Sequence, residues 1–202
     1  MNYPLFHTLT FDVMYACAGI LIFVMFERTL YLSYLAVRSA QIAREIGPRS
    51  PASTAPAMSG RKSRDPITQA VARYVDAAAH TGITRGQLED YSAALYIEVD
   101  KKISARLWVL DTIITAAPLL GLLGTILGII DTFRTLAQSG ISDPSAVSKG
   151  IGVALFATAI GIATALYALL FHNLFQAQMA RILDIIRIIL MRVGFVQTGG
   201  GA

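Results

Sequence analysis

The chain has 202 residues, of which 54% are hydrophobic and 15% are charged, and its net charge is +4. Soluble domains carry about 25% charged residues, so the composition argues against a soluble enzyme or a nucleic-acid-binding protein and favours an integral membrane protein. The length suits one structural unit. The single cysteine, Cys17, lies in an apolar run, so we expect a small packing residue, no disulfide framework, no metal site and no cofactor.

The first predicted transmembrane helix covers residues 11–37 and follows an outer N-terminal stretch, residues 1–10. Its uncharged core, Val13–Phe26, is shorter than the ~20 residues that cross a bilayer. The helix becomes long enough if it continues through Glu27 and Arg28, whose side chains would lie near the headgroups. Because no Lys or Arg precedes this segment and no A-x-A site follows it, we interpret it as a retained helix and not a signal peptide.

A cytoplasmic segment, residues 38–107, is predicted to follow the first span. It contains a stretch rich in Pro, Ser, Ala and Gly, Gly47–Arg64, which is typical of a linker. Asp65 followed by Pro66 is typical of a helix start. We expect that helix to end near Gly82.

A second cytoplasmic helix is predicted from a capping box that Thr84 and Gln87 can form. Since no proline follows before Pro118, we expect one continuous helix that passes Trp108 at the membrane interface and becomes the second span. The third span is expected to continue as an amphipathic helix to about Gly194.

The second and third spans are the clearest apolar runs, and Thr112–Ile130 and Gly150–Phe171 contain no charged residue and no histidine. We therefore predict an all-α integral membrane protein with three transmembrane helices, of which the second and third extend into the cytoplasm as long helices. The segments predicted after residue 107 are a second span at 108–131, a short outer loop at 132–148, a third span at 149–172 and a cytoplasmic tail at 173–202.

The distribution of positive charge predicts the orientation. The segment Arg38–Arg106 carries eleven of the seventeen Lys and Arg residues, and the stretch before the first span carries none. Loops rich in Lys and Arg remain in the cytoplasm. We therefore expect the N-terminus outside the membrane and the C-terminus in the cytoplasm.

Small residues recur at helix-contact spacing in the second and third spans. In lipid, such residues let helix backbones approach closely, and dispersion supplies the attraction. This much small-residue surface predicts a helix hairpin that also assembles with other copies of the chain. The predicted packing residues are Gly121, Gly124, Gly128, Ala154, Ala157, Gly161 and Ala165.

Two threonines, Thr125 and Thr158, are polar residues deep inside these spans. Each hydroxyl can bond the carbonyl one turn back on its own helix, or it can line a narrow polar path; the residues leave both readings open. Pro118 removes one backbone hydrogen bond and predicts either a fixed kink or a hinge beside that path. His172, at the cytoplasmic end of the third span, is expected to be an interfacial anchor.

A proton path needs a group that binds and releases a proton, and intramembrane carboxylates usually serve this purpose. Neither deep span supplies one. If the protein conducts protons, the titrating group therefore has to come from another chain.

Three stretches resemble segments of the MotA/TolQ/ExbB family. APLLGLLGTILGIIDTF (Ala117–Phe133) resembles the family's second span and KGIGVALFATAIGIATAL (Lys149–Leu166) its third, while FERTLYL (Phe26–Leu32) looks like the end of its first span. The resemblance covers the membrane parts, roughly half of the chain. Three spans and a small cytoplasmic part favour ExbB-like members over flagellar ones.

The resemblance implies a bacterial inner-membrane protein that forms a homo-oligomer, a pentamer in ExbB-like proteins, around an ExbD-like partner. That single-span partner carries the membrane aspartate, and a TonB-like protein receives the motion that proton flow drives. The resemblance also implies that Thr125 and Thr158 line the pore and that Pro118 has a functional role.

One position departs from the family pattern, because Val153 stands where ExbB and TolQ proteins often carry a glutamate. We therefore keep two alternatives to an ExbB-like motor subunit: a TolQ-like subunit of an envelope and cell-division motor, and a non-conducting scaffold of the same fold. An enzyme is disfavoured, since the chain contains neither H-E-x-x-H nor G-x-S-x-G.

Overall fold

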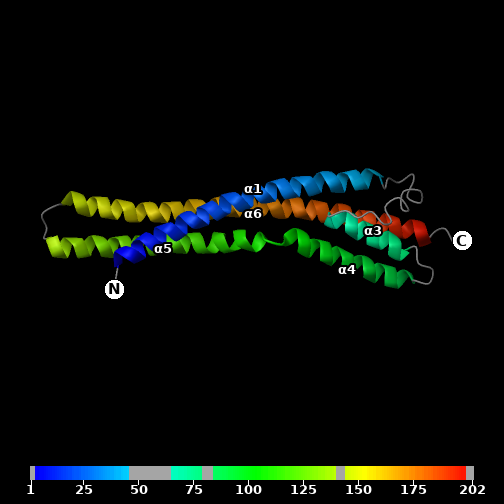
Figure 1. The fold of residues 1–202 in the computed structure, drawn as a ribbon, viewed down its shortest axis with the longest axis horizontal. Coiled ribbons are helices and arrows are strands. Elements are labelled where there is room, and N and C mark those ends of the chain that lie inside the picture. The colour runs from blue at the N-terminus through cyan, green and yellow to red at the C-terminus, as the bar shows by residue number, and fades with distance from the viewer. Residues whose placement is uncertain (1–2, 46–64, 79–83, 140–143, 199–202) are drawn as a thin grey trace. The chain divides into compact units, whose positions relative to one another are not determined.

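A computed structural model describes residues 3–45, 65–78, 84–139 and 144–198. Within these ranges the secondary structure is α-helical and without strands, which confirms the predicted fold class. The predicted linker, Gly47–Arg64, and the predicted helix end at Gly82 lie outside the described residues. The helices, labelled as in Figure 1, are α1 Tyr3–Glu45, α3 Pro66–Ala78, α4 Arg85–Ser104, α5 Leu107–Ser139 and α6 Pro144–Thr198.

Three helices are long and apolar enough to cross a membrane, as predicted. The candidate spans are Thr10–Arg44 in α1, Leu107–Gln138 in α5 and Val147–Val193 in α6. All three run further than the predicted spans, and most of the stretch predicted as an outer loop, 132–148, is helical. Helical backbone persists there because the α5 sequence contains no glycine or proline between Gly128 and its last residue.

The chain divides into two compact units. The first, which we call the spanning unit, contains Met1–Glu27 and Arg106–Leu174. The second, the extension unit, contains Arg28–Ala105 and Phe175–Ala202. Helices α1 and α6 each contribute to both units.

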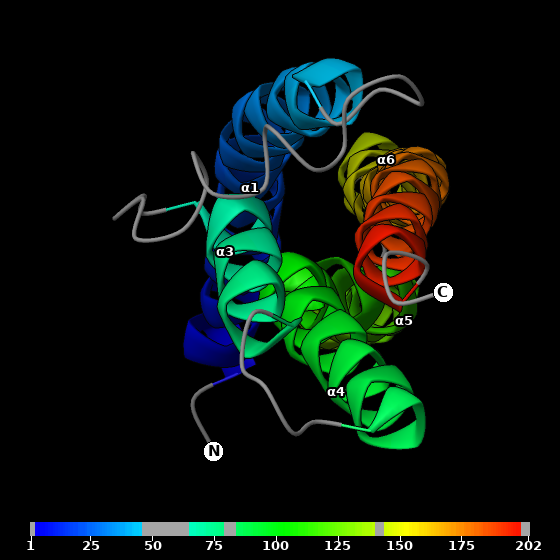
Figure 2. The same ribbon diagram turned by 90° about the vertical axis from the view of Figure 1, so that its right-hand side faces the viewer.

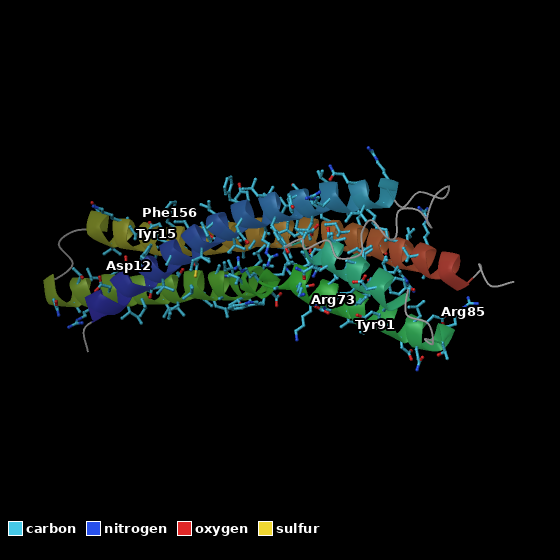
Figure 3. The ribbon with its side chains drawn as sticks, turned by 45° about the vertical axis from the view of Figure 1, so that its right-hand side comes forward. Asp12, Tyr15, Arg73, Arg85, Tyr91 and Phe156 are labelled. Atoms are coloured by element: carbon cyan, nitrogen blue, oxygen red, sulfur yellow. The ribbon has the colours of Figure 1, made fainter. Side chains whose placement is uncertain are left out.

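Within the spanning unit, α5 and the first part of α6 form an antiparallel hairpin (Figure 1). Large apolar side chains cover the outer surface of the spanning unit, as expected for helices solvated by lipid. Tyr15 on α1 and Phe156 on α6, both labelled in Figure 3, are 58% and 61% exposed.

Within the extension unit, α3 packs alongside α4 (Figure 2). The predicted start of α3 is confirmed, because the helix begins at Pro66 and the carbonyl of Asp65 accepts a hydrogen bond from the amide of Gln69 at 3.0 Å. The predicted capping box of α4 is also present, with Thr84 and Gln87 bonded in both directions.

The part of α6 after Leu174 has the predicted amphipathic pattern. Its charged residues Arg181, Asp184 and Arg187 are exposed, and apolar side chains fill the other faces. The helix ends at Thr198, four residues beyond the predicted end near Gly194. The buried apolar residues of this segment are Ile182, Leu183, Ile186, Ile189, Leu190 and Val193.

The prediction of one continuous helix from Thr84 into the second span is wrong. Helix α4 ends at Ser104, α5 begins at Leu107, and Arg106 between them has a φ of 76°. The sequence also did not predict the burial of Arg28, which is 2% exposed and donates from Nη1 to the carbonyl of Ile103 at 3.1 Å. Both deviations depend on contacts between residues far apart in the sequence.

Candidate functional site

Helices α5 and α6 of the spanning unit come into backbone contact at two glycines. A Cβ atom built on Gly161 would lie 2.6 Å from the carbonyl oxygen of Ala117, and one built on Gly121 would lie 3.0 Å from the Cα of Thr158. Real Cβ atoms do not approach other atoms this closely, so a side chain at Gly161 would push the helices apart. These glycines set the separation of the two spans.

Two further glycines of α5 lie against alanines of α6. A Cβ on Gly124 would approach the Cβ of Ala157 to 3.0 Å, and a Cβ on Gly128 would approach the Cβ of Ala154 to 2.8 Å. Ala154 and Ala157 are 0% and 1% exposed. The structure therefore brings six of the seven predicted packing residues into one α5–α6 contact. The seventh, Ala165, is buried on α6 one turn beyond Gly161.

The hydroxyls of Thr125 and Thr158 meet inside this contact. Thr158 Oγ1 lies 3.0 Å from the carbonyl oxygen of Gly121 on the opposite helix, and Thr125 Oγ1 lies 3.2 Å from the carbonyl oxygen of Ala154 on the opposite helix. The two hydroxyl oxygens are also within hydrogen-bond contact of each other. Both side chains are half-buried.

Proton counting limits how this cluster can be bonded. Each threonine hydroxyl donates one hydrogen bond and can accept two. Thr125 has three possible acceptors, because the carbonyl of Gly121 on its own helix lies 3.2 Å away in addition to Ala154 O and the Thr158 hydroxyl. The two hydroxyl protons therefore have more than two oxygen atoms to which they can be donated. Such a cluster can exchange donors without moving a heavy atom.

Other threonines of these spans donate to the carbonyl one turn back on their own helix. Thr164 Oγ1 donates to the carbonyl of Ile160 at 2.8 Å, and Thr132 Oγ1 donates to the carbonyl of Gly128 at 2.8 Å, each one turn back on its own helix. The Thr158 hydroxyl instead bonds to α5. The pair Thr125–Thr158 thus differs from its neighbours by crossing between helices.

The remaining predicted residues lie outside the hydroxyl cluster. Pro118 is half-buried within α5, and the helix continues past it. Val153 is 42% exposed on α6 and next to the fully buried Ala154, so its side chain leaves the helix away from the α5 contact. His172 is half-buried near the end of the spanning unit.

Thr10 is a polar residue beside this site that sequence reasoning missed. It is 8% exposed, and its Cγ2 would lie 3.8 Å from a Cβ on Gly124. The residue precedes the uncharged run of the first span, where it reads as an ordinary flanking threonine. Its only sequence signal is its position at the start of the predicted helix.

The charged side chains of the extension unit form a surface network on α3 and α4. Arg73, labelled in Figure 3, donates to both carboxylate oxygens of Glu98 at 3.1 and 3.2 Å. Lys102 donates to the same carboxylate at 2.7 Å. The Lys102 hydrogen bond is the main reason why the pKa of Glu98 lies below its usual value. Burial raises the pKa of the nearby Tyr74, with a further increase from the charge of Glu89.

Among the described residues, no three His, Cys, Asp or Glu side chains gather as a metal site would require. Within Thr112–Ile130 and Gly150–Phe171, which contain no charged residue, the polar groups at the α5–α6 contact are hydroxyls and backbone carbonyls.

A model of the MotA/TolQ/ExbB proton channel family matches residues 62–188. The chain belongs to this family. The match runs from the end of the predicted linker through α3, α4 and α5 into the part of α6 after Leu174, so it includes the whole hydroxyl cluster. The resemblance inferred from the spans is thereby confirmed, and the family is one of channels and not of enzymes.

Members with different names are similar to the chain. Biopolymer transport protein ExbB of Aquifex aeolicus is 32% identical over 103 residues, which is 51% of this chain and 68% of that protein. A putative ExbB homolog of Methanothermobacter thermautotrophicus is 42% identical over 82 residues, 41% of this chain and 29% of that protein. Tol-Pal system protein TolQ of Pseudomonas aeruginosa is 39% identical over 79 residues, 39% of this chain and 34% of that protein.

The chain thus covers about two thirds of the Aquifex protein and about a third of each of the other two. Identity to ExbB and TolQ proteins of the MotA/TolQ/ExbB family falls in the same range. The similarity therefore establishes the family, and it favours neither an ExbB nor a TolQ protein.

Proposed function

We propose that this chain is the channel-forming subunit of an ExbB-like motor driven by the proton-motive force in the bacterial inner membrane. In this proposal it works with an ExbD-like single-span partner that carries a membrane aspartate, and it energises TonB-dependent outer-membrane transport. The observation that carries the proposal is the hydroxyl pair Thr125–Thr158, held between two otherwise apolar helices of a proton channel family member.

The Thr125–Thr158 pair is better suited to passing a proton along hydrogen bonds than to taking up and releasing one. A threonine hydroxyl does not gain or lose a net proton near neutral pH, but it can accept a hydrogen bond on one side while it donates on the other. No carboxylate lies in Thr112–Ile130 or Gly150–Phe171 to take up the proton itself. The aspartate of an ExbD-like partner would supply that group, with Thr125 and Thr158 aligned beside it.

A homo-oligomer, which we propose to be a pentamer, agrees with the small residues that the hairpin leaves exposed. Gly152, Ala159 and Ala163 lie on exposed positions of α6, and a Cβ on Gly152 would meet nothing within 4 Å. Such a stripe allows a helix of another copy to approach closely. The α5–α6 hairpin therefore has one small-residue surface for its own contact and a second for assembly.

The proposed orientation places the N-terminus in the periplasm and the C-terminus in the cytoplasm. It is supported by the concentration of Lys and Arg in Arg38–Arg106. The extension unit would then lie in the cytoplasm. Its exposed ion pairs of Arg73, Glu98 and Lys102 agree with an aqueous environment.

A TolQ-like role is the second candidate, since the TolQ relative is as similar to the chain as the ExbB relatives are. A non-conducting scaffold is the third, and Val153 favours it. This valine occupies an exposed position on α6 where a glutamate would face a partner or another copy. In the conducting proposal, the partner aspartate is the sole proton carrier, and Val153 contributes an apolar contact.

The test combines co-expression with an ExbD-like partner and measurement of proton-gradient-dependent uptake in cells that lack their own ExbB. We expect Thr125→Ala and Thr158→Ala to lower uptake at least tenfold. The matched control is Thr164→Ala, which removes a hydroxyl bonded within α6 and should leave uptake nearly unchanged. Equal uptake in all three variants would remove the hydroxyl pair from the mechanism.

The output system is tested by complementation in two strains. Restored uptake in a strain without ExbB, with no restored envelope integrity in a strain without TolQ, supports the TonB output. The opposite pattern supports the Tol output. Proteoliposomes with the purified subunit and partner distinguish both from the scaffold, which would show no proton flux under an imposed gradient.

A further inference from the structure

The first span contains a carboxylate, which the deep parts of the other two spans lack. Asp12, labelled in Figure 3, lies on α1 in the spanning unit and within the candidate span Thr10–Arg44. The uncharged run Val13–Phe26 begins at the next residue. In the sequence, Asp12 therefore looks like a residue of the outer membrane surface, and its depth has to be taken from the contacts of α1.

Two contacts within the spanning unit establish the level of Asp12. Near the start of α1, the Cγ2 atom of Thr10 lies 3.8 Å from the position of a Cβ built on Gly124 of α5. Further along α1, Oε1 of Glu27 lies 2.8 Å from Nη1 of Arg106, where α5 is about to begin. Helix α1 therefore runs antiparallel to α5, and Asp12 lies between these two contacts, close to the first.

The position between the two contacts places Asp12 inside the membrane. Two residues of helix rise about 3 Å, so Asp12 is level with the residues of α5 that just precede Gly124. These residues form the middle of Thr112–Ile130, the uncharged run of the second span. Measured along α1, Asp12 is about 22 Å from Glu27, which is most of the ~30 Å thickness of the hydrocarbon core.

Asp12 lies on the side of α1 that faces away from the other spans. The packed side contains Thr10 and Met14, which are 8% and 1% exposed. Two residues turn a helix by about 200°, so Asp12 leaves α1 nearly opposite Thr10, and it is exposed. The same side of α1 carries Tyr15 and Phe23, which are 58% and 70% exposed. The carboxyl group therefore faces lipid or another chain, and not the hydroxyl pair.

The described side chains leave the charge of an ionised Asp12 uncompensated, since among them its carboxylate has neither a hydrogen bond nor an ion pair. Along α1 the nearest titratable residues are Tyr15, which brings no positive charge, and His7. His7 is five residues away, beyond the three or four at which helix neighbours meet. Thr112–Ile130 and Gly150–Phe171 contain neither a charged residue nor a histidine, so a second copy brings no cation to this depth with these runs. An ionised carboxylate in hydrocarbon is costly, and a proton removes its charge without a further chain.

We propose that Asp12 is a proton-binding site within the membrane, where its carboxyl group takes up a proton and is held neutral. A protonated carboxyl group has one O–H donor and keeps acceptor capacity, so it can bond to a polar group of another membrane helix without burying a charge. The site goes beyond the proposed motor function. It lies on the far side of α1 from α5 and passes no proton to Thr125 or Thr158.

The first experiment treats the full chain in lipid nanodiscs with dicyclohexylcarbodiimide, a lipid-soluble reagent for protonated carboxyl groups. The acid proton moves to a nitrogen of the reagent, the carboxyl oxygen adds to its central carbon, and acyl transfer to nitrogen leaves a stable N-acylurea. At neutral pH we expect Asp12 to react at least tenfold faster than two comparison residues. These are Asp131, directly after the uncharged run of α5, and Asp90, exposed on α4. Peptide mass spectrometry measures the modified fraction of each.

The pH and a second reagent test the cause of the reaction. Alkaline pH should slow the modification of Asp12, because the reagent needs the protonated form. A water-soluble carbodiimide should reverse the preference and modify Asp90 faster than Asp12. Modification of Asp12 by the lipid-soluble reagent that is no faster than that of Asp131 would contradict the proposal.

The second experiment does not depend on a reagent that reaches Asp12. A protonated carboxyl group has an infrared carbonyl stretching band that a carboxylate lacks. In the full chain at neutral pH, in a detergent without ester groups, this band should be lost in Asp12→Asn and kept in the matched control Asp131→Asn. Asparagine has nearly the shape of the protonated acid, so the helix should be retained. An unchanged band in Asp12→Asn would mean that Asp12 is ionised, through water or a cation of another chain, and would overturn the proposal.

Discussion

The α5–α6 contact of the spanning unit and the core of the extension unit are held together by different means. In the first, backbone meets backbone at Gly121 and Gly161, and hydroxyls cross between the helices. In the second, large aliphatic side chains fill the interior, and Ile67, Val71 and Ile186 are completely buried. One helix, α6, takes part in both units and changes its composition between them.

In the proposed arrangement, with the spanning unit in lipid and the extension unit in water, the surroundings explain this contrast. In water, burying a large apolar side chain is favourable because it leaves the solvent. In lipid that gain is lost, because the acyl chains are as apolar as leucine, and helices associate through close packing and hydrogen bonds. The comparison teaches that a substitution has to be judged by the unit in which it falls.

The largest expected effect is in the extension unit. Ile186→Ala removes a side chain that is 0% exposed and should lower the free energy of unfolding by about 2–5 kcal/mol. Ile188→Ala, two residues further on the same helix, truncates a side chain that is 48% exposed and should cost much less. Chemical denaturation in detergent measures both. Similar losses would mean that the buried face of α6 is not the core of this unit.

The next effect is in the spanning unit, where adding one methyl group should do the damage. Gly161→Ala places a Cβ 2.6 Å from the carbonyl oxygen of Ala117, and overpacking of this kind costs about 1–3 kcal/mol. The matched substitution Gly19→Ala, on α1 of the same unit, meets nothing within 4 Å and should be neutral or slightly stabilising, because alanine is the better helix former. Thermal unfolding in detergent compares the two, and a stable Gly161→Ala variant would refute the close approach.

A smaller effect should separate the two kinds of threonine. Thr158→Val removes a hydroxyl that bonds across to α5, and interhelical bonds of this type are worth about 0.6–1.7 kcal/mol. Thr164→Val removes a bond within α6 and should cost less, since valine preserves the shape. If the two valine variants lost equal stability in the same unfolding assay, the crossing bond would have no special energetic role.

The smallest effect concerns the surface of the extension unit. Hydrogen bonding to Lys102 lowers the pKa of Glu98 from 4.5, so the charged form is favoured in the folded state. The stabilisation is therefore complete above pH 4.5 and is lost as the pH falls through the lowered pKa of the folded state. Exposed helix pairs contribute about 0.3–0.5 kcal/mol, so Glu98→Gln should be slightly less stable at neutral pH.

The control for this prediction is the pH itself. The stability difference between the unmodified chain and Glu98→Gln should vanish in acid, and it should shrink in high salt at neutral pH. A difference that persists in both conditions would point to a packing role for the side chain. No comparable charge-removing substitution can be made within Thr112–Ile130 of α5 or Gly150–Phe171 of α6, because these stretches contain no charged residue.

Much of the fold follows from the sequence because its causes are local. Two long uncharged runs predicted the second and third spans, and a shorter run continued through Glu27 and Arg28 predicted the first. Asp65-Pro66 predicted the start of α3, and Thr84 with Gln87 predicted the capping box of α4. The spacing of glycines and alanines indicated the faces that approach. In each case the physical signal lies within a few residues, so it can be read without the partner helix.

The tertiary structure decided the features that depend on distant residues. Both readings of Thr125 and Thr158 were compatible with the sequence, and only the position of α6 beside α5 directs their hydroxyls to the opposite backbone. The break at Arg106 was missed because its own residues favour a helix. Its partners, Glu27 and Arg28, lie more than 70 residues earlier in the chain, and a contact over that separation leaves no local periodicity to read.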